Sequence, residues 1–333
     1  MNALEWRGPV LVTGAGGFIG RRVVARLLQE GVGVRALLLP DEAAPAEWTE
    51  PPNGVKVVRG DICDPDAVRR ALDGTDRLIH LAALVGDWGA EAAHRRVTVG
   101  GTETIFRAAA DAGVRCVLAS SIVVYGDALG RDVCHEEHPP GRACGAYGRA
   151  KQAQEQIARG LERERGLQLS VVRPANVFGP GSGPWVRDLC AQLRSGLPTL
   201  IGGGDYDAGL TYVDNVADLL VRAAGHPAAV GRIYNANDDH GVTWRRYCGD
   251  LAEMIGAHPP RSLPRWLANA AAGACEAIWR RAGWRSRPPV TREALNLVGS
   301  RHRVPIERAR RELGYEPRIG YAEGLAAVAA SLR

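Results

Sequence analysis

The chain has 333 residues, of which 46% are hydrophobic and 24% are charged, and its net charge is +5. This length can bury a large core, as one large α/β domain or as two intertwined domains. The small positive charge, without a basic cluster interleaved with aromatic residues, argues against nucleic-acid binding. No apolar run of about 18 residues exists, so no membrane-spanning helix is expected.

The cysteine and histidine patterns argue against structural metals and disulfides. Seven cysteines, an odd number without a C-x-x-C pair, are typical of a reduced, cytoplasmic protein with neither disulfides nor a zinc site. His135 and His138 lie in a polar segment that we expect to be a surface loop rather than a metal site. The apolar segment 9–12 is too short for a secretory signal and is expected to be a buried strand.

Up to residue 175, short apolar segments alternate with helical ones. This alternation predicts a doubly wound α/β domain over residues 1–175, with a parallel sheet covered by helices on both faces. The predicted strands are Val10–Thr13, Gly33–Leu39, Val55–Arg59, Arg77–Leu81, Val114–Ser120 and Leu167–Arg173. The predicted helices are Gly20–Glu30, Asp64–Leu72, Thr102–Ala112 and Tyr147–Arg165, with a surface loop over 40–52.

A glycine-rich turn, Thr13-Gly-Ala-Gly-Gly-Phe-Ile-Gly20, follows the first predicted strand. Its G-x-x-G-x-x-G spacing suits a tight turn, close approach of the backbone to a pyrophosphate, and close packing of helix on strand. Because the turn joins a strand to a helix, it indicates a dinucleotide-binding Rossmann domain rather than a structural turn. The expected cofactor contacts here are Gly14, Gly16, Gly17, Phe18, Ile19 and Gly20.

Two later strand ends carry segments that fit the same cofactor. Gly60-Asp61-Ile62 follows the third predicted strand, where Asp61 can accept a hydrogen bond from an adenine amino group. His80-Leu-Ala-Ala83 follows the fourth, where small side chains leave room for the cofactor. Either segment alone is as compatible with a structural role. The predicted cofactor contacts are Asp61, Ile62, Leu81, Ala82 and Ala83.

Only two of the 42 basic residues are lysines, Lys56 and Lys151. Lys151 follows Tyr147 by four residues, a spacing that places both side chains on one helix face. A neighbouring ammonium favours the phenolate and is expected to lower the pKa of Tyr147 from its ordinary value of about 10, which would make it a general acid and base. Because this spacing also occurs by chance, an ordinary exposed helix face is the alternative.

Beyond residue 176, glycine and proline interrupt the pattern. We expect a smaller, mainly helical substrate lobe over 176–333, with strands around 210–235 returning to the first domain. The predicted helices are Val213–Ala224, Trp244–Ile255, Trp266–Trp279 and Ile306–Leu313, with a surface loop over 257–264.

Six motifs, T-G-x-x-G-x-x-G, G-D-I, H-L-A-A, S-S-x-x-V-Y-G, Y-x-x-x-K and R-P-x-N-V-F-G-P-G, occur in this order between Thr13 and Gly181. Together they resemble the extended short-chain dehydrogenase/reductase superfamily of the NAD-dependent epimerase/dehydratase type. The resemblance implies an enzyme in which Ser121 holds the substrate oxygen, Tyr147 exchanges a proton with it, and Lys151 binds the nicotinamide ribose. It also implies cofactor contacts at Pro174, Asn176 and Val177, and a homodimer formed through Thr102–Ala112 and Tyr147–Arg165.

Two departures from the family pattern concern the cofactor and the proton relay. Thr98 stands where relatives often have an asparagine of the relay. Leu38 and Leu39 stand where NAD users carry an acid and NADP users an arginine. Since a 2′-phosphate needs a cation while hydroxyls tolerate a neutral wall, we expect NAD rather than NADP, with the roles of Arg35 and Asp41 open.

The substrate is expected to be bulky and mostly apolar. Ala208 stands where nucleotide-sugar enzymes carry a diphosphate-binding arginine. Several later segments resemble the 3β-hydroxysteroid dehydrogenase-like branch, which implies a sterol-like or 3-hydroxy/3-keto acid substrate, with decarboxylation where a β-keto acid forms. The candidate substrate contacts are Val85, Trp88, Ser121, Val123 and Asn176.

Two alternative functions stay open at this point. One is a nucleotide-sugar epimerase or dehydratase with tightly held NAD, in which Arg187 or Arg232 supplies the diphosphate contact. The other is a cofactor-sensing protein without turnover.

Residues 261–287 combine arginines with Trp266, Trp279 and Trp284. This segment could form an apolar lid, touch a membrane surface as a peripheral contact, or serve as an ordinary lobe helix or subunit contact.

Overall fold

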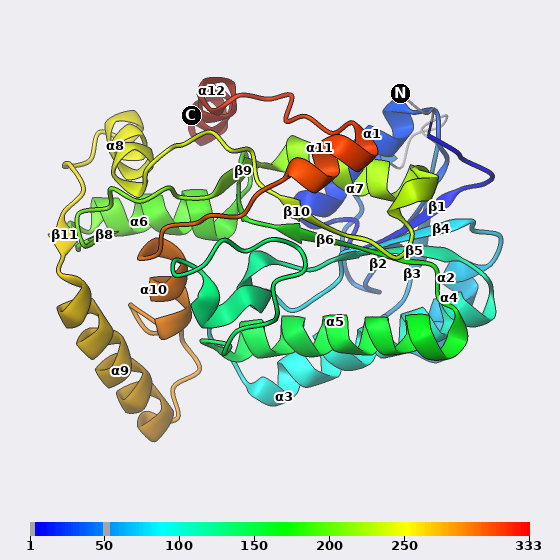
Figure 1. Ribbon diagram of the computed structural model, residues 1–333, viewed down its shortest axis with the longest axis horizontal. Helices are drawn as coiled ribbons and strands as arrows, with labels where there is room; N and C mark the ends of the chain where they lie inside the picture. The colour runs from blue at the N-terminus through cyan, green and yellow to red at the C-terminus, as the bar shows by residue number, and fades with distance from the viewer. Residues whose placement is uncertain (1–3, 49–53) are drawn as a thin grey trace.

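The computed structural model describes residues 4–48 and 54–333. Its centre is a seven-stranded, wholly parallel sheet in the order β10-β6-β5-β4-β1-β2-β3 (Figure 1). The strand order reverses between β1 and β4, which is where α/β sheets bind ligands. The predicted doubly wound sheet is therefore confirmed. Its strands are β1 (Val10–Thr13), β2 (Val34–Leu38), β3 (Val55–Arg59), β4 (Arg77–His80), β5 (Arg115–Ala119), β6 (Leu169–Pro174) and β10 (Ile233–Ala236).

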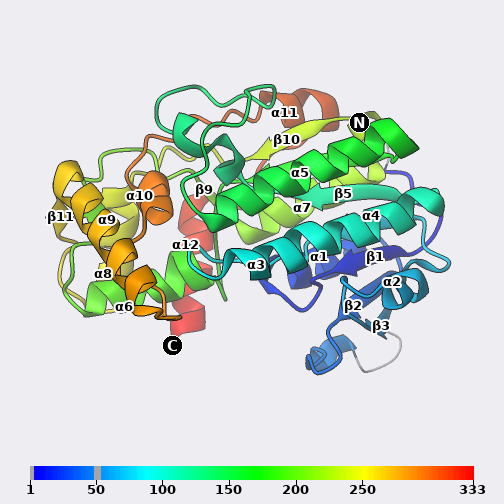
Figure 2. The same cartoon turned by 90° about the horizontal axis from the view of Figure 1, so that it is seen from below.

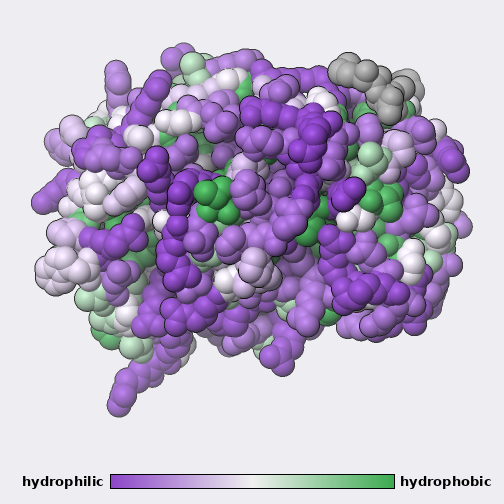
Figure 3. All heavy atoms as spheres, in the orientation of Figure 1, coloured by the Kyte–Doolittle hydropathy of each residue, from purple (hydrophilic) through white to green (hydrophobic). Residues whose placement is uncertain are grey.

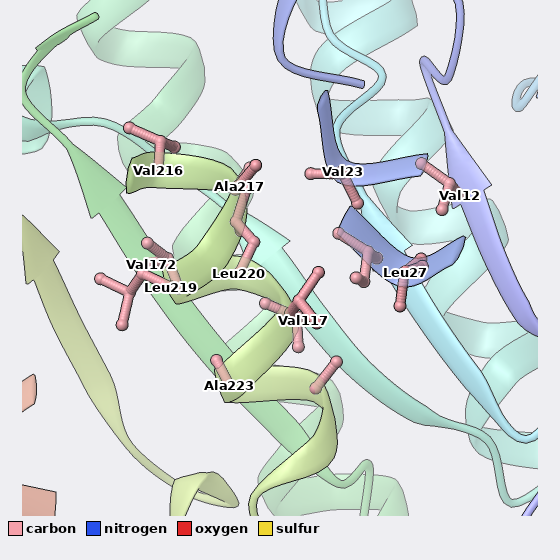
Figure 4. Packing of buried hydrophobic residues seen from close by; sticks show 14 of the residues in the cluster. Val12, Val23, Leu27, Val117, Val172, Val216, Ala217, Leu219, Leu220 and Ala223 are labelled. Atoms are coloured by element: carbon pink, nitrogen blue, oxygen red, sulfur yellow. The ribbon is translucent and has the colours of Figure 1, made fainter. Parts of the chain in front are cut away.

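Helices α1 (Phe18–Gln29), α7 (Val213–Gly225) and α11 (Glu307–Leu313) cover one face of this sheet (Figure 1). Val23 and Leu27 of α1 and Leu220 of α7 pack against strand residues such as Val12 and Val117, all fully buried (Figure 4). Each such side chain stabilises the fold by roughly 1.5–3 kcal/mol through burial. This layer holds the glycine-rich turn against the sheet, because α1 starts directly after that turn.

Helices α2 (Pro65–Leu72), α4 (Gly101–Asp111) and α5 (Ala146–Arg165) cover the other face, where α4 and α5 run side by side (Figure 2). The sequence sets their ends. Asp64 caps α2 by accepting a hydrogen bond from the Asp66 N–H, and proline stands in its first turn. Helix α5 ends at Gly166, which adopts a φ of +68° that glycine tolerates. A short helix, α3 (Glu91–His94), and a π-helical segment at 95–100 lead into α4.

The second lobe is built from short elements around an aromatic core. Strand β7 (Asn176–Phe178) pairs with β9 (Leu210–Tyr212), and β8 (Leu200–Ile201) pairs with β11 (Ser262–Leu263). The ring of Phe178 lies 5.4 Å from that of Tyr212 and 5.8 Å from that of Tyr247, both edge-on. The helices of this lobe are α6 (Leu189–Arg194), α8 (Trp244–Met254), α9 (Arg265–Ala282), α10 (Arg292–Val298) and α12 (Tyr321–Leu332).

The predicted strands and helices are all present, with ends that differ from the prediction by at most three residues. Strand β10 joins the main sheet, whereas β9 pairs with β7 outside it. Two loop predictions need correction, because β11 lies within the predicted loop 257–264 and a short 3-10 turn, Ala46–Trp48, lies within the predicted loop 40–52. The rest of that loop, residues 49–52, lies outside the described residues, and the domain division at residue 175 stays a prediction.

Candidate active site

The glycine-rich turn presents bare backbone at the carboxyl end of β1. Gly14 has a φ of +64°, and a Cβ on it would lie 2.9 Å from the Ala82 nitrogen. A Cβ on Gly20 would lie 2.7 Å from the Ala15 carbonyl oxygen. Helix α1 begins after Gly17 without a side-chain cap, so its first N–H groups point to where an anion can bind. The turn and the adjoining 81–83 segment therefore fit a dinucleotide pyrophosphate.

A carboxylate that the sequence reasoning missed lies over this turn. Leu38 ends β2, as expected, but the chain then bends so that the carboxylate of Glu42 occupies the space in which a Cβ on Gly16 would sit. Its Oε2 accepts a hydrogen bond from the Leu39 N–H at 3.1 Å. Because Glu42 stands four residues past the strand end, its spacing gave no signal.

Arg35 and Asp41, whose roles the sequence leaves open, lie away from the glycine-rich turn or are exposed. Arg35 donates to the Arg70 carbonyl at 2.9 Å and to the Asp73 carbonyl, near the end of α2. Asp41 is exposed. Asp61 accepts a hydrogen bond from the Cys63 N–H at 2.9 Å at the end of β3, and Ile62 is buried.

Ser121, Tyr147 and Lys151 come together beyond the carboxyl end of β5. Ser121 caps the following 3-10 turn by accepting a hydrogen bond from the Val123 N–H at 3.3 Å, and its side chain is close enough to Tyr147 to lower the pKa of that phenol. Lys151 is 3% exposed, and its Nζ lies 5.9 Å from the centre of the Tyr147 ring. The structure thus assembles these three residues, and their catalytic roles stay predictions.

The pKa of Tyr147 is raised, whereas the sequence predicts that it is lowered. Burial raises the pKa of Tyr147, Glu293 raises it further, and the nearby Ser121 side chain lowers it. Burial also lowers the pKa of Lys151 to about 8, against a raising effect of Glu155. The Lys151 ammonium donates to the Ala119 carbonyl and to Gln154 Oε1, both at 2.9 Å, rather than to the phenol. Tyr147 is therefore protonated at neutral pH.

A buried chain of hydrogen bonds joins the glycine-rich turn to the lysine. The Thr13 hydroxyl lies 2.7 Å from His80 Nδ1, and His80 Nε2 lies 2.9 Å from the Thr102 hydroxyl. That hydroxyl accepts from Gln154 Nε2 at 2.7 Å, and Gln154 Oε1 accepts from Lys151. Burial, and then Lys151, lower the pKa of His80 to about 3, so it is neutral. The network fixes the position of the Lys151 ammonium. Of the residues that link the glycine-rich turn to Lys151, the sequence motifs pointed only to His80, in H-L-A-A.

Glu293 of α10 is a second residue that the sequence reasoning missed. It is 3% exposed, and its Oε1 accepts a hydrogen bond from the Gly148 N–H at 2.8 Å, in the first turn of α5. Its other oxygen, Oε2, is buried and has no hydrogen-bond partner among the described residues. Burial raises its pKa to about 7, and nearby Asp87 raises it too, whereas the bond to Gly148 lowers it. The lobe thereby places a titratable group beside Tyr147.

Two of the candidate substrate contacts point into protein interior. Val123 is 6% exposed, and the Asn176 side chain donates to the Ala208 carbonyl at 2.7 Å. Two other predicted cofactor contacts lie nearby. Pro174 is the last residue of β6, and Val177 lies in β7. The predicted contacts of Asn176 and Val123 would therefore be made by backbone atoms, or by the side chains after a local rearrangement.

The 84–88 segment lies over the edge of the site and holds the remaining candidates. Val85 is 67% exposed, and the guanidinium of Arg280 lies 5.4 Å from the centre of the Trp88 ring. Thr98, in the π-helical segment, accepts a hydrogen bond from the Leu84 N–H at 3.0 Å and is fully buried. Thr98 therefore positions this segment, and such π-helical interruptions often occur at functional sites.

The two arginines considered as diphosphate contacts, Arg187 and Arg232, lie in different parts of the structure. Ala208 is fully buried in the lobe core and carries no charge. Arg232 directly precedes β10 and lies at the amino edge of the sheet, 3.9 Å from Glu312, on the side opposite to Tyr147. Arg187 is exposed and lies 3.2 Å from Asp188. Arg232 is thus excluded as the diphosphate contact, and Arg187 is left.

Three further findings bear on metals, thiols and membranes. No three His, Cys, Asp or Glu side chains of residues 4–48 and 54–333 are arranged to hold a metal ion. All seven cysteines are free thiols. Within the described part of the chain, no helix combines the length and the apolar character needed to cross a bilayer.

Comparison with known proteins agrees with this geometry. The sequence model of the NAD dependent epimerase/dehydratase family matches residues 10–236. The chain therefore belongs to this family, and it is an NAD(P)-dependent enzyme of the extended short-chain dehydrogenase/reductase type.

Individual relatives and structures span the whole chain. It is 31% identical to the 4-hydroxy-2-methyl-3-oxo-4-farnesyl-3,4-dihydroquinoline-1-oxide ketoreductase of Stigmatella aurantiaca, over 95% of this chain and 94% of that protein. It is 28% identical to the 2-alkyl-3-oxoalkanoate reductase of Stenotrophomonas maltophilia, over 97% and 98%. The structure of MoeE5 in complex with UDP-glucose and NAD superposes with a TM-score of 0.74 at 27% identity, covering 98% of this chain and 99% of that one.

Proposed function

We propose that the protein reduces a ketone on a bulky, mostly apolar substrate with NADH, and that it can also run the reverse oxidation of the secondary alcohol. The observation that carries this proposal is the grouping of Ser121, Tyr147 and Lys151, in which Ser121 is close enough to Tyr147 to lower the pKa of its phenol and Lys151 lies one helical turn away. Two hydroxyls that meet beside a dinucleotide-binding turn can hold and protonate one carbonyl oxygen.

The protein's part in this reaction is proton transfer and positioning. Bound NADH supplies the hydride that reaches the carbonyl carbon. Ser121 holds the carbonyl oxygen, and Tyr147 gives it the proton that completes the alcohol. The raised pKa of Tyr147 keeps this proton on the phenol at neutral pH. Lys151, held by its buried hydrogen bonds, is placed to contact the nicotinamide ribose.

The apolar substrate class rests on the relatives and on Ala208. Two relatives are named as ketoreductases of a farnesyl-bearing and an alkyl-bearing substrate. A buried alanine in place of a diphosphate-binding arginine argues in the same direction. Sterol-like ketones and 3-keto acids are both candidates. Where the alcohol carries a β-carboxylate, its oxidation gives a β-keto acid that can lose CO2.

The preference for NAD over NADP rests on Glu42. Its carboxylate lies over the glycine-rich turn beside the end of β2, where it can accept hydrogen bonds from ribose hydroxyls and would repel a 2′-phosphate. Two arginines near this carboxylate are bonded to the backbone: Arg21 donates to the Gly16 carbonyl at 3.0 Å, and Arg59 donates to the Leu39 carbonyl at 3.1 Å and to the Glu42 carbonyl.

A nucleotide-sugar epimerase or dehydratase with tightly held NAD is the second candidate. The observation that favours it is the fold similarity to MoeE5, whose structure contains UDP-glucose and NAD. Arg187 would then supply the diphosphate contact. Release of NAD on denaturation, and turnover of nucleotide sugars without net redox change, would support this function.

The test follows NADH and NADPH absorbance with panels of sterol-like ketones, 3-keto acids and nucleotide sugars. We expect NADH oxidation with an apolar ketone. Tyr147→Phe should lower the rate about a hundredfold to ten-thousandfold and keep cofactor binding. Tyr206→Phe, in the second lobe, is the matched control and should keep the wild-type rate. Turnover of nucleotide sugars alone would refute the proposal, and an active Tyr147→Phe enzyme would refute the mechanism.

Two further proposals concern the assembly of the protein and its location in the cell. The family resemblance supports a homodimer formed through α4 and α5, which light scattering of the purified protein would test. The seven free thiols support a reducing compartment such as the cytoplasm, which fractionation of the cells that make it would test.

A further inference from the structure

Helix α9 buries small residues and exposes large apolar ones. Its inner stripe, Ala268, Ala272 and Glu276, is buried, with a spacing of four residues that places the three side chains on one helix face. Ala268 and Ala272 pack against Leu295 of α10. On other faces, Trp266 is 72% exposed and Ile278 is 53% exposed. An ordinary lobe helix shows the reverse arrangement, because burying large apolar side chains stabilises a fold.

The apolar surface continues past the end of the helix. Trp284 is 52% exposed, and its ring meets that of Trp279 edge-on at 4.7 Å between centres. In the orientation of Figure 1, helix α9 extends from the body of the molecule at the lower left, where Figure 3 shows hydrophobic spheres among hydrophilic ones. Contiguous exposed apolar side chains of this kind mark an interaction surface.

The charges around this apolar surface have one sign. Arg265, Arg281 and Arg285 are exposed on α9 and the turn that follows it. The single acidic residue of α9, Glu276, is buried, where it pairs with Arg280 at 3.0 Å and accepts a hydrogen bond from the Arg292 N–H at 2.8 Å. The outward surface is therefore apolar and cationic, which complements an apolar layer bordered by negative charge.

We propose that residues 265–285 dock the protein on the surface of an anionic lipid bilayer, with Trp266, Ile278 and Trp284 in the headgroup region and the arginines on lipid phosphates. Trp and Arg are the side chains that suit this interface. A second copy of the chain is a poorer occupant, because a two-fold contact would place the same arginines against one another without an exposed carboxylate on α9.

The docking surface adjoins the segment that the proposed function assigns to the substrate. Arg280 stacks on Trp88, and Arg287 pairs with Asp87 at 2.6 Å. The neighbouring Val85 is 67% exposed. If the proposed function holds, an apolar substrate dissolved in the bilayer would meet the 84–88 segment without crossing much water. This consequence rests on the proposed function, whereas the docking itself does not.

The test is co-sedimentation of the full chain with vesicles, without substrate or cofactor. Vesicles of phosphatidylcholine alone are compared with mixed phosphatidylcholine and phosphatidylglycerol vesicles. We expect binding to the mixed vesicles, weakened in high salt, where the screening length falls to about 3 Å. The double variant Trp266→Ser/Ile278→Ser should lower the partition coefficient about tenfold or more, since it removes the inserted apolar area. Arg281→Gln/Arg285→Gln should remove the preference for the anionic lipid.

Matched controls lie on the far side of the molecule. Val230→Ser changes an apolar residue that is 37% exposed, and Arg163→Gln changes an exposed arginine of α5. Both should bind vesicles like the wild type. All variants should keep the wild-type rate on a water-soluble ketone. Absence of binding to the mixed vesicles, or wild-type binding by the Trp266/Ile278 variant, would overturn the proposal. The proposal would also be overturned if the protein did not bind vesicles and light scattering showed that the Trp266/Ile278 variant converts a dimer to a monomer.

Discussion

Replacement of Glu293 by glutamine tests the electrostatics beside Tyr147. Glutamine keeps the shape of the side chain and an oxygen that can accept the Gly148 N–H bond, but it cannot ionise. Burial raises the pKa of Glu293 from 4.5 to about 7. The charged groups that face it are Asp87, which raises its pKa, and Arg149, which lowers it. Tyr147 and Cys144 lie beside it, and the charge of Glu293 raises the pKa of both.

The sign and size of the effect follow from proton linkage. Because the folded protein holds the Glu293 proton more tightly than the unfolded chain does, this group's contribution to stability is complete below pH 4.5 and is lost as the pH rises towards 7. The two pKa values give a loss of about 2.5 kcal/mol between about pH 5 and about pH 8. The Glu293→Gln variant does not suffer this loss. It should therefore gain about 2.5 kcal/mol relative to the wild type over the same interval.

Urea denaturation of both proteins at the two pH values measures this difference, because the contributions of all other titrating groups cancel. Glu164→Gln, which changes an exposed carboxylate of α5, the helix that carries Tyr147, is the control and should follow the wild type. Parallel stability curves for the wild type and Glu293→Gln would refute the reasoning. They would show that Glu293 ionises as easily in the folded protein as in the unfolded chain.

Three further substitutions test the cofactor site and the core. Glu42→Gln should narrow the preference for NADH over NADPH about tenfold, a change of about 1.4 kcal/mol, in fluorescence titrations, and an unchanged ratio would contradict the role of Glu42. Gly20→Ala should abolish cofactor binding while the far-UV spectrum stays, because its Cβ would lie 2.7 Å from the Ala15 oxygen; normal titration would contradict that contact. Glu155→Ala should lower the free energy of unfolding in urea by about 3–5 kcal/mol, since Arg173 would stay buried without the carboxylate to which it donates two hydrogen bonds, of 2.9 and 2.6 Å. A smaller loss would show that water reaches Arg173.

Local patterns predicted the fold well because the main sheet is built from consecutive units. The strands of the main sheet are mostly short apolar runs, since helices cover both faces of the sheet, and most of these runs precede a helix with its own periodicity. The glycine-rich turn and the Tyr147/Lys151 pair are likewise local, so their spacing alone located them.

Contacts between distant segments could not be predicted in the same way. Glu293 meets Gly148 across 145 positions, and no motif links the two segments. Glu42 reaches the glycine-rich turn only because the chain bends after β2. The pKa of Tyr147 was predicted in the wrong direction because the spacing shows that Lys151 is near, but not that the phenol is buried and that Glu293 lies beside it.

Because the chain contains only two lysines, its side-chain amines can be labelled selectively. Lys56 is exposed on the surface, whereas Lys151 is 3% exposed and its pKa is lowered to about 8. With no third lysine in the chain, an amine-selective acylating reagent can modify only these two side chains. The extent of labelling of the peptide that contains Lys151, with that of Lys56 as internal standard, therefore reports directly on access to the nicotinamide end of the site.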